Sequence, residues 1–199
     1  MLYLLSILFC VIIIAMLNIL FLPQTLGFAF WQIIIWSVVA TISVIVIDGL
    51  MATLIRWICP QKWFVFGKKI FVAKKKECFF YEKLGIKKWK DKVLELGQFT
   101  SFRKNKISDP TNNEYIERYI LEANYGVGCH WAGIIFGFFA IFACPSQLYL
   151  TIGLPVCLVN VFYNYLSIAI LRYNLPKLYV LHKFNAKRIC KQADMPKSS

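Results

Sequence analysis

Residues 132–171, AGIIFGFFAIFACPSQLYLTIGLPVCLVNVFYNYLSIAIL, decide the fold. This run of 40 residues contains no charged side chain, and it is interrupted by the turn-forming sequence CPSQ at residues 144–147. A helix needs about 20 apolar residues to cross roughly 30 Å of hydrocarbon. The run is therefore long enough for a hairpin of two transmembrane helices.

Two more uncharged runs, residues 1–22 and 27–47, each have the length of one crossing. Across the whole chain 59% of residues are hydrophobic and the mean hydropathy is +0.59, whereas about half of the residues of a soluble domain are apolar. The first run lacks the basic start and the clear cleavage site of a signal peptide, so we expect it to be a retained anchor. The sequence predicts an all-α polytopic membrane protein with four transmembrane helices and cytoplasmic amphipathic or interfacial helices.

The charges predict the orientation of these helices. Residues 60–126 contain 15 Lys and Arg against 8 Asp and Glu, and residues 172–199 contain 7 against 1. The opposite turns, residues 23–26 and 144–147, carry no charge. By the positive-inside rule, the protein is a multi-pass protein of the cell membrane with both termini in the cytoplasm. The net charge of +13 then follows from topology and from attraction to anionic lipids, and no nucleic-acid-binding module is visible.

Four segments are predicted along the chain. They are a transmembrane hairpin at residues 1–58 (spans at about 1–22 and 28–57), a basic cytoplasmic or interfacial segment at 59–121, a second hairpin at 122–172 (spans at about 123–144 and 148–171), and a basic tail helix at 173–199. Because proline suits the first turn of a helix, Pro176 predicts that the tail helix starts separately from the last span.

Local signals refine the middle segment. Residues 77–96 have apolar side chains at helical intervals, and Gly85 should break or bend this helix. After a polar stretch at residues 97–113, a helix capped by Asn112 or Asn113 should run without a break into the third span. The seven cysteines lack metal-ligand spacing, so we expect free thiols and no metal site. Palmitoylation of Cys59 or Cys129 is an alternative to their simple packing as small apolar side chains.

Polar side chains occur inside the predicted spans, where such groups are costly and usually functional. They are Asp48, His130, Asn160 and Asn164. Three of them lie eight residues from a charge that marks the predicted cytoplasmic boundary: Asp48 from Arg56, His130 from Glu122, and Asn164 from Arg172. Eight residues correspond to about 12 Å of helical rise, so three helices should present Asp, His and Asn in a single layer.

This layer predicts a general base. A carboxylate, Asp48 or Glu122, would hold one nitrogen of His130, and the other nitrogen would accept a proton from a substrate hydroxyl. The motifs GxSxG and SxxK are absent, which favours direct transfer over a covalent enzyme intermediate. Alternatively, the polar residues only hold helices together, an effect of about 0.6 kcal/mol per pair. Trp131 is either a membrane-belt residue or part of a pocket for a lipid chain.

Three sequence blocks occur in order: FYEKLGIKKWKDKVLELG at residues 80–97, ILEANYGVGCHW at 120–131, and LRYNLPKL at 171–178. With these blocks the chain resembles the glycosyl-4,4'-diaponeurosporenoate acyltransferases over residues 77–181, about half of its length. It departs from their pattern at Leu171 and Leu175, where the family has glutamine and arginine, and near Gly126, where a basic residue is missing. The first two spans also extend beyond the family's usual N-terminus.

The resemblance implies an integral membrane enzyme that esterifies a sugar hydroxyl of a glycolipid with a fatty acyl group. By position it implies catalytic roles for Glu122 and His130. It also implies substrate contacts for Trp89, Lys90, Arg172, Tyr173 and Asn174. To these contacts we add Trp131 and Asn164. Acyl-CoA or acyl carrier protein would serve as co-substrate from the cytoplasm, with no bound cofactor. The rival hypotheses are a non-catalytic membrane factor that binds anionic lipid or a partner protein, and an S-acyl or methyl transferase.

Overall fold

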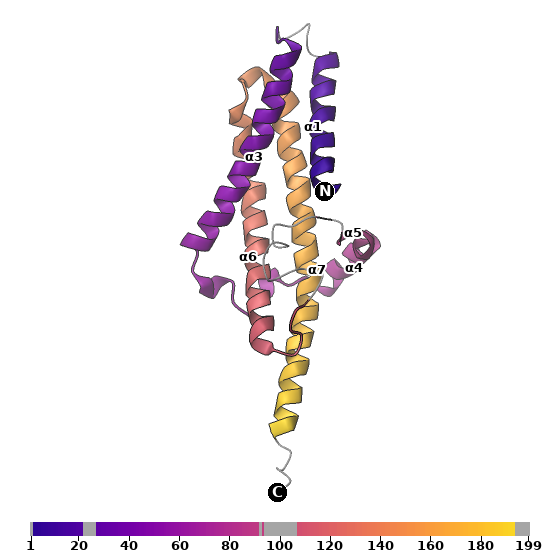
Figure 1. Cartoon of the computed structure of the whole chain (residues 1–199), viewed down its shortest axis with the longest axis vertical. Coiled ribbons are helices and arrows are strands. Elements are labelled where there is room, and N and C mark those ends of the chain that lie inside the picture. The colour runs from indigo at the N-terminus through magenta and orange to yellow at the C-terminus, as the bar shows by residue number, and fades with distance from the viewer. Residues whose placement is uncertain (1, 22–26, 92, 94–106, 194–199) are drawn as a thin grey trace. The chain divides into compact units, whose positions relative to one another are not determined.

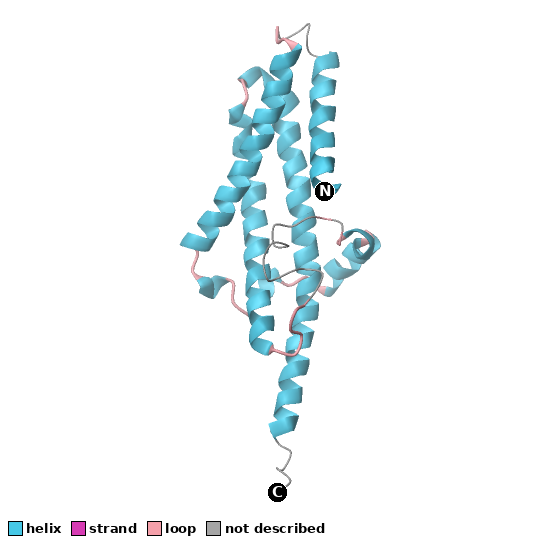
Figure 2. Cartoon of the chain, viewed as in Figure 1, coloured by secondary structure: helices cyan, strands magenta, loops and turns pink. Residues whose placement is uncertain are grey.

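The computed structural model describes residues 2–21, 27–91, 93 and 107–193, and every regular element in this part of the chain is helical (Figures 1 and 2). The all-α prediction is confirmed. The chain forms two compact units, each described on its own below. Unit 1 comprises residues 1–59, 92–94 and 128–168, and unit 2 comprises residues 60–91, 95–127 and 169–199.

Unit 1 is built from apolar helices. They are α1 (Leu2–Phe21), α3 (Phe30–Ile58), the end of α6 (Asn113–Gly137), the 3-10 helices η4 (Phe138–Ala143) and η5 (Ser146–Leu148), the π-helix η6 (Tyr149–Gly153), and the first part of α7 (Leu154–Ala193). Pro145 separates η4 from η5 in an extended conformation, so the hairpin turns at the CPSQ sequence as predicted. Figure 1 shows α1 alongside α3.

The core of unit 1 consists mainly of aliphatic side chains from α1, α3, α7 and the turn region between α6 and α7. Ile33 and Ala40 of α3 are fully buried, together with Leu148 and Ile152 from the turn region. Asn18 of α1 donates a hydrogen bond to the carbonyl oxygen of Thr151 (2.8 Å), which ties the end of α1 to η6. Many other apolar side chains of α1 and α3 remain exposed, as expected for helices that face lipid.

Three described helical segments are long and apolar enough to cross a membrane: Phe30–Ile58, Asn113–Ala143 and Ser146–Ile189. The apolar helix at the N-terminus is shorter within the residues searched, Leu5–Phe21. A membrane protein is therefore supported, and the fourth crossing and the cytoplasmic placement of the termini stay predictions.

Unit 2 combines four short helices with parts of two long ones. The short helices are η1 (Gln61–Trp63), η2 (Lys69–Phe71), α4 (Lys75–Lys83) and α5 (Ile86–Trp89), and the long ones contribute the first part of α6 and the rest of α7. Gly85 has φ of 69° and separates α4 from α5, which confirms the predicted break, because only glycine adopts this conformation without strain. Most of the polar stretch at residues 97–113 lies outside the described residues.

Two predictions for α6 are confirmed. The side-chain oxygen of Asn112 accepts hydrogen bonds from the backbone N–H groups of Glu114 (2.9 Å) and Tyr115 (3.2 Å), so Asn112 is the cap. The helix then continues without interruption to Gly137. Its buried residues Ile116 and Ile120 pack with Leu175 and other apolar side chains of α7.

The expectation of a separate tail helix at Pro176 is wrong. Helix α7 continues from Leu154 through Pro176 to Ala193. A proline inside a helix removes one N–H donor and crowds the carbonyl group four residues earlier, here Arg172, but it leaves the neighbouring hydrogen bonds in place. Leu175 and Leu178, on either side of Pro176, are buried in the unit 2 core, and this packing stabilises the helix across the proline.

Candidate active site

Four polar side chains meet inside the apolar helices of unit 1, and we name them the polar cluster: Asp48 of α3, His130 of α6, and Asn160 and Asn164 of α7. Asn160 and Asn164 are buried, with 8% and 6% of their surfaces exposed, and Asp48 and His130 are partly buried. The three residues of the predicted layer, Asp48, His130 and Asn164, therefore lie in one hydrogen-bonded group. Their chemical roles stay predictions.

Asn164 is the centre of the cluster. Its amide nitrogen donates to Asp48 Oδ2 (2.9 Å) and to Asn160 Oδ1 (2.7 Å), and its Oδ1 lies 2.7 Å from His130 Nδ1. An amide nitrogen can only donate, so these two acceptors fix which way the Asn164 amide faces. Its oxygen must then accept a hydrogen bond from His130 Nδ1. In the neutral imidazole this leaves Nε2 unprotonated and able to accept a proton.

This arrangement differs from the expected direct contact between a carboxylate and the imidazole. Asp48 acts on His130 through Asn164, because an amide can accept from the ring on one side and donate to the carboxylate on the other. The prediction that Asn164 contacts substrate stays untested, and in the structure its side chain is hydrogen-bonded to His130, Asp48 and Asn160. Asparagine as the orienting partner of a catalytic histidine also occurs in Cys-His-Asn proteases.

Asn160 supports the cluster from one turn earlier on α7. Its amide nitrogen donates to the carbonyl oxygen of Gly133 (3.2 Å) and more weakly to Asp48 Oδ1 (3.4 Å). Its side-chain oxygen accepts from Asn164. Each amide of the cluster thus has a partner for its nitrogen and its oxygen, as burial in an apolar bundle requires.

Two glycines of α6 make room for the cluster. A Cβ atom at Gly133 would lie 2.7 Å from Asp48 Oδ1 and 3.0 Å from Asn164 Oδ1, and one at Gly137 would collide with the side-chain amide nitrogen of Asn160. Sequence reasoning missed these positions. The spacing of the pair, GIIFG at residues 133–137, is the signal that could have found them, since small residues four apart let membrane helices approach closely.

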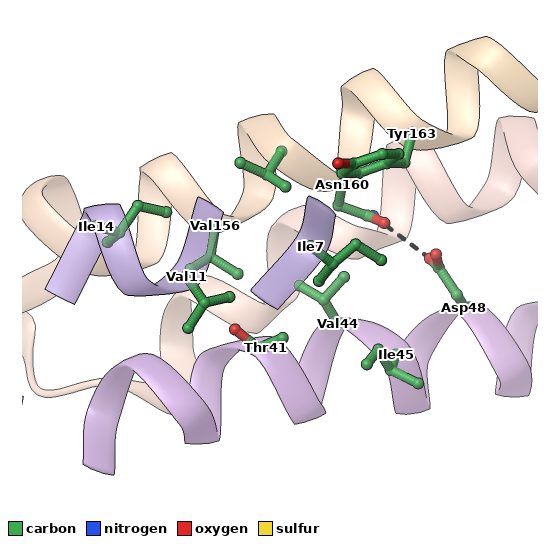
Figure 3. Close-up of a pocket in the computed structure, with 11 residues that line it drawn as sticks. Ile7, Val11, Ile14, Thr41, Val44, Ile45, Asp48, Val156, Asn160 and Tyr163 are labelled. Carbon is green, nitrogen blue, oxygen red and sulfur yellow. Dashed lines mark hydrogen bonds between the residues drawn. The ribbon is translucent and has the colours of Figure 1, made fainter. Parts of the chain in front are cut away.

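An apolar pocket of about 70 Å³ adjoins the cluster within unit 1 (Figure 3). Side chains of α1, α3 and α7 line it, among them Ile7, Val11, Val44 and Val156. Asp48 and Asn160 lie at one end of the pocket, where the dashed line in Figure 3 joins them. Its volume is small compared with the 300–1,000 Å³ typical of ligand sites, so it fits only a slender apolar group.

Arg172 of unit 2 forms a two-pronged ion pair. Its Nε and Nη2 donate to the two carboxylate oxygens of Glu77 (2.6 and 2.7 Å), and its Nη1 donates to the carbonyl oxygen of Ile70 (2.7 Å). The hydrogen bonds from Arg172 hold the pKa of Glu77 below its ordinary value. These contacts fasten α4 and the loop at η2 to α7. Substrate binding by Arg172 remains a prediction.

Two further predicted residues, Trp89 and Tyr173, make hydrogen bonds within unit 2. Trp89 Nε1 donates to the carbonyl oxygen of Leu84 (3.0 Å) and its ring packs against the apolar cluster that contains Tyr173. The Tyr173 hydroxyl donates to Glu82 Oε1 (2.8 Å). Trp89 of the first sequence block and Tyr173 of the third are thus neighbours in unit 2.

The predicted site residues divide between the two units. Asp48, His130, Trp131 and Asn164 belong to unit 1, and Trp89, Lys90, Glu122, Arg172, Tyr173 and Asn174 belong to unit 2. Trp131 is 46% exposed. Among the described residues, no group of three or more His, Cys, Asp and Glu side chains is placed to hold a metal ion.

The family model described as glycosyl-4,4'-diaponeurosporenoate acyltransferase matches residues 60–183, which confirms the resemblance found in the three sequence blocks. The match includes His130 and Asn164 but not Asp48. No curated protein and no solved structure matches the chain.

Alanine substitutions at two glycines should change the free energy of unfolding in opposite directions. Gly133→Ala should lower the free energy of unfolding by about 1–3 kcal/mol, because the new methyl group displaces the Asp48 and Asn164 side chains from their hydrogen bonds. Gly49→Ala is the control, since a Cβ there meets nothing within 4 Å and alanine favours a helix by up to about 1 kcal/mol. Thermal unfolding in detergent measures both. Equal effects of the two substitutions would contradict the close approach at Gly133.

The Glu77–Arg172 pair predicts acid sensitivity of unit 2. Because the folded-state pKa of Glu77 is depressed, the pair stabilises the fold above the ordinary value near 4.5 and is lost as pH falls through the lower folded-state value. Glu77→Gln should lower the free energy of unfolding by about 2 kcal/mol at neutral pH. On acidification the variant should lose less of this free energy than the wild type does. Thermal unfolding across this pH range measures it, with the exposed Asp91→Asn as control. Identical acid profiles for wild type and Glu77→Gln would refute it.

Proposed function

Because the chain belongs to the glycosyl-4,4'-diaponeurosporenoate acyltransferase family, we propose that it moves a fatty acyl group from a cytoplasmic thioester donor to a hydroxyl group of a glycolipid in the membrane. Family membership supports acyl transfer and a membrane location. The thioester donor, the cytoplasmic side and the part played by His130 are our inferences from the site.

His130 is the proposed general base. The acceptor hydroxyl attacks the carbonyl carbon of the thioester while His130 Nε2 takes the hydroxyl proton. A C–O bond forms, the C–S bond breaks, and the imidazolium returns the proton to the departing thiolate. The products are an ester and a free thiol, and the ring is again neutral.

The observation that carries this proposal is the hydrogen-bond chain from Asp48 through Asn164 to His130 Nδ1 (2.9 and 2.7 Å). It holds the ring in the tautomer that a base needs, and it places a carboxylate where it can stabilise the imidazolium formed during proton transfer. Gly133 keeps the backbone of α6 close enough for the chain to form.

The donor would approach from the basic side of the protein. Acyl-CoA carries phosphates and acyl carrier proteins carry acidic surfaces, and both would be attracted by the excess of Lys and Arg in residues 60–126. In unit 2, Lys88 is exposed, Lys90 is partly buried, and Lys87 pairs with Glu82 (2.9 Å). Lys88 and Lys90 are therefore the stronger candidates for a donor contact, beside Trp89.

A non-catalytic role for the cluster is the alternative. Its members satisfy one another's hydrogen bonds, which is also what polar residues do when they only join membrane helices. The two accounts differ in what happens when the histidine is removed.

His130→Ala should reduce ester formation by a factor of about 10²–10⁴ while leaving a folded protein, because it removes the base and not the apolar core. Mass spectrometry of lipids from cells that make the wild type, the variant or neither would measure the esters that depend on the protein. His182→Ala is the matched control, since the second histidine lies in unit 2 and pairs with the exposed Glu117 (2.7 Å). Wild-type ester levels from a destabilised His130→Ala protein would favour the non-catalytic role instead.

A further inference from the structure

We propose that the pocket between α1, α3 and α7 holds the acyl chain that is being transferred, and that residues of α1 set the length of this chain. This inference rests on the proposed function and adds a binding site and a specificity determinant to it.

The lining determines what class of group can occupy the pocket. Three α1 residues of the lining, Ile7, Val11 and Ile14, are aliphatic, and so are Val44 of α3 and Val156 of α7 (Figure 3). The single ionisable carboxylate of the lining, Asp48, is engaged with Asn160 and Asn164. An apolar occupant needs no hydrogen-bond partner in such surroundings, whereas a charged head group would be left without a partner.

The pocket is elongated in the direction that an acyl chain requires. Its lining follows α1 from residue 7 to residue 14 and α3 from residue 41 to residue 48, which is about 10 Å of helical rise on each helix. In Figure 3 Asp48 and Asn160 lie at one end, and Ile14 and Thr41 lie toward the other. The pocket therefore extends along these helices, with Asp48 and Asn160 at one end, while the hydroxyl group of Thr41, toward the other end, donates to the carbonyl oxygen of Ser37.

The polar end is the end where chemistry is proposed. Asp48 both lines the pocket and holds Asn164, the partner of His130. A chain with its thioester carbonyl at the polar cluster would extend its tail along Val11 toward Ile14. The length that fits would then be limited by the side chains at the far end, in the way that an apolar pocket discriminates single methylene groups.

The lining residues of α1 and α3 also lie outside the matched family region, residues 60–183, whereas Val156 and Asn160 lie inside it. The pocket thus combines one family helix with two helices from the preceding part of the chain. A bilayer lipid that stays bound and only fills space is the competing occupant, and the test separates it from the transferred chain.

The test uses substitutions that should shift the product in opposite directions. Val11→Phe fills the pocket and should favour shorter acyl groups in the ester, and Ile14→Ala removes the stop and should favour longer ones. Ile12 is the control position because it is 46% exposed and is not part of the lining, so Ile12→Phe and Ile12→Ala match the two changes in kind. The readout is the distribution of acyl chain lengths in the esters that depend on the protein, measured by lipid mass spectrometry.

We expect the ratio of long to short acyl groups to fall about tenfold in Val11→Phe and to rise in Ile14→Ala, with both Ile12 variants like the wild type. Unchanged chain lengths in pocket variants that still make ester would overturn the pocket assignment and would leave the proposed function standing. If the acyl chain lengths are unchanged but the thermal stability of the pocket variants is altered, the occupant is a structural lipid instead. No ester from the wild type would overturn both proposals. If Val11→Phe does not fold, Ile14→Ala decides the question.

Discussion

The hydrogen bonds of the Asn164 side chain are the interaction on which the site depends. An ionisable imidazole and a carboxylate are costly inside an apolar bundle unless each has a partner. One amide satisfies both requirements, because its oxygen meets His130 and its nitrogen meets Asp48. The glycine at position 133 follows from the same constraint, since any side chain there would occupy the space of these atoms.

Hydrophobicity and local signals in the sequence predicted much of the fold. Three of the four expected crossings, the cap at Asn112 and the break at Gly85 follow from neighbouring residues only, and the structure has a candidate span, a cap and a break at these places. The helix through Pro176 was not predicted, because burial of Leu175 and Leu178 depends on α6, which is distant in sequence. Tertiary packing of this kind overrides a local preference worth a few kcal/mol.

The candidate site was predicted in part for a similar reason. Spacing from flanking charges gives the depth of a residue in a span, which brought Asp48, His130 and Asn164 into one layer. It does not give the rotation of each helix about its axis, which decides which two of the three side chains touch. The bridging position of Asn164, the support from Asn160 and the need for glycine at 133 are all consequences of that rotation. The apolar pocket depends on three helices together and has no signal in any one of them.

The family match covers only part of the site. His130 and Asn164 lie within residues 60–183, and Asp48 and most of the pocket lie before them. In our account the base and its orienting amide belong to the part shared with the family. The preceding helices add a carboxylate behind that amide and the wall of the chain-binding pocket.

The tautomer of His130 tests this account most directly. The chain has two histidines, so in a His182→Gln protein with labelled imidazole nitrogens the ¹⁵N spectrum reports His130 alone. We predict that the neutral ring carries its hydrogen on Nδ1 and that Nε2 has the chemical shift of an unprotonated nitrogen. A neutral ring protonated on Nε2 would mean that Asn164 does not accept from Nδ1. Nε2 could then not accept the proton of the acceptor hydroxyl, which would contradict the account.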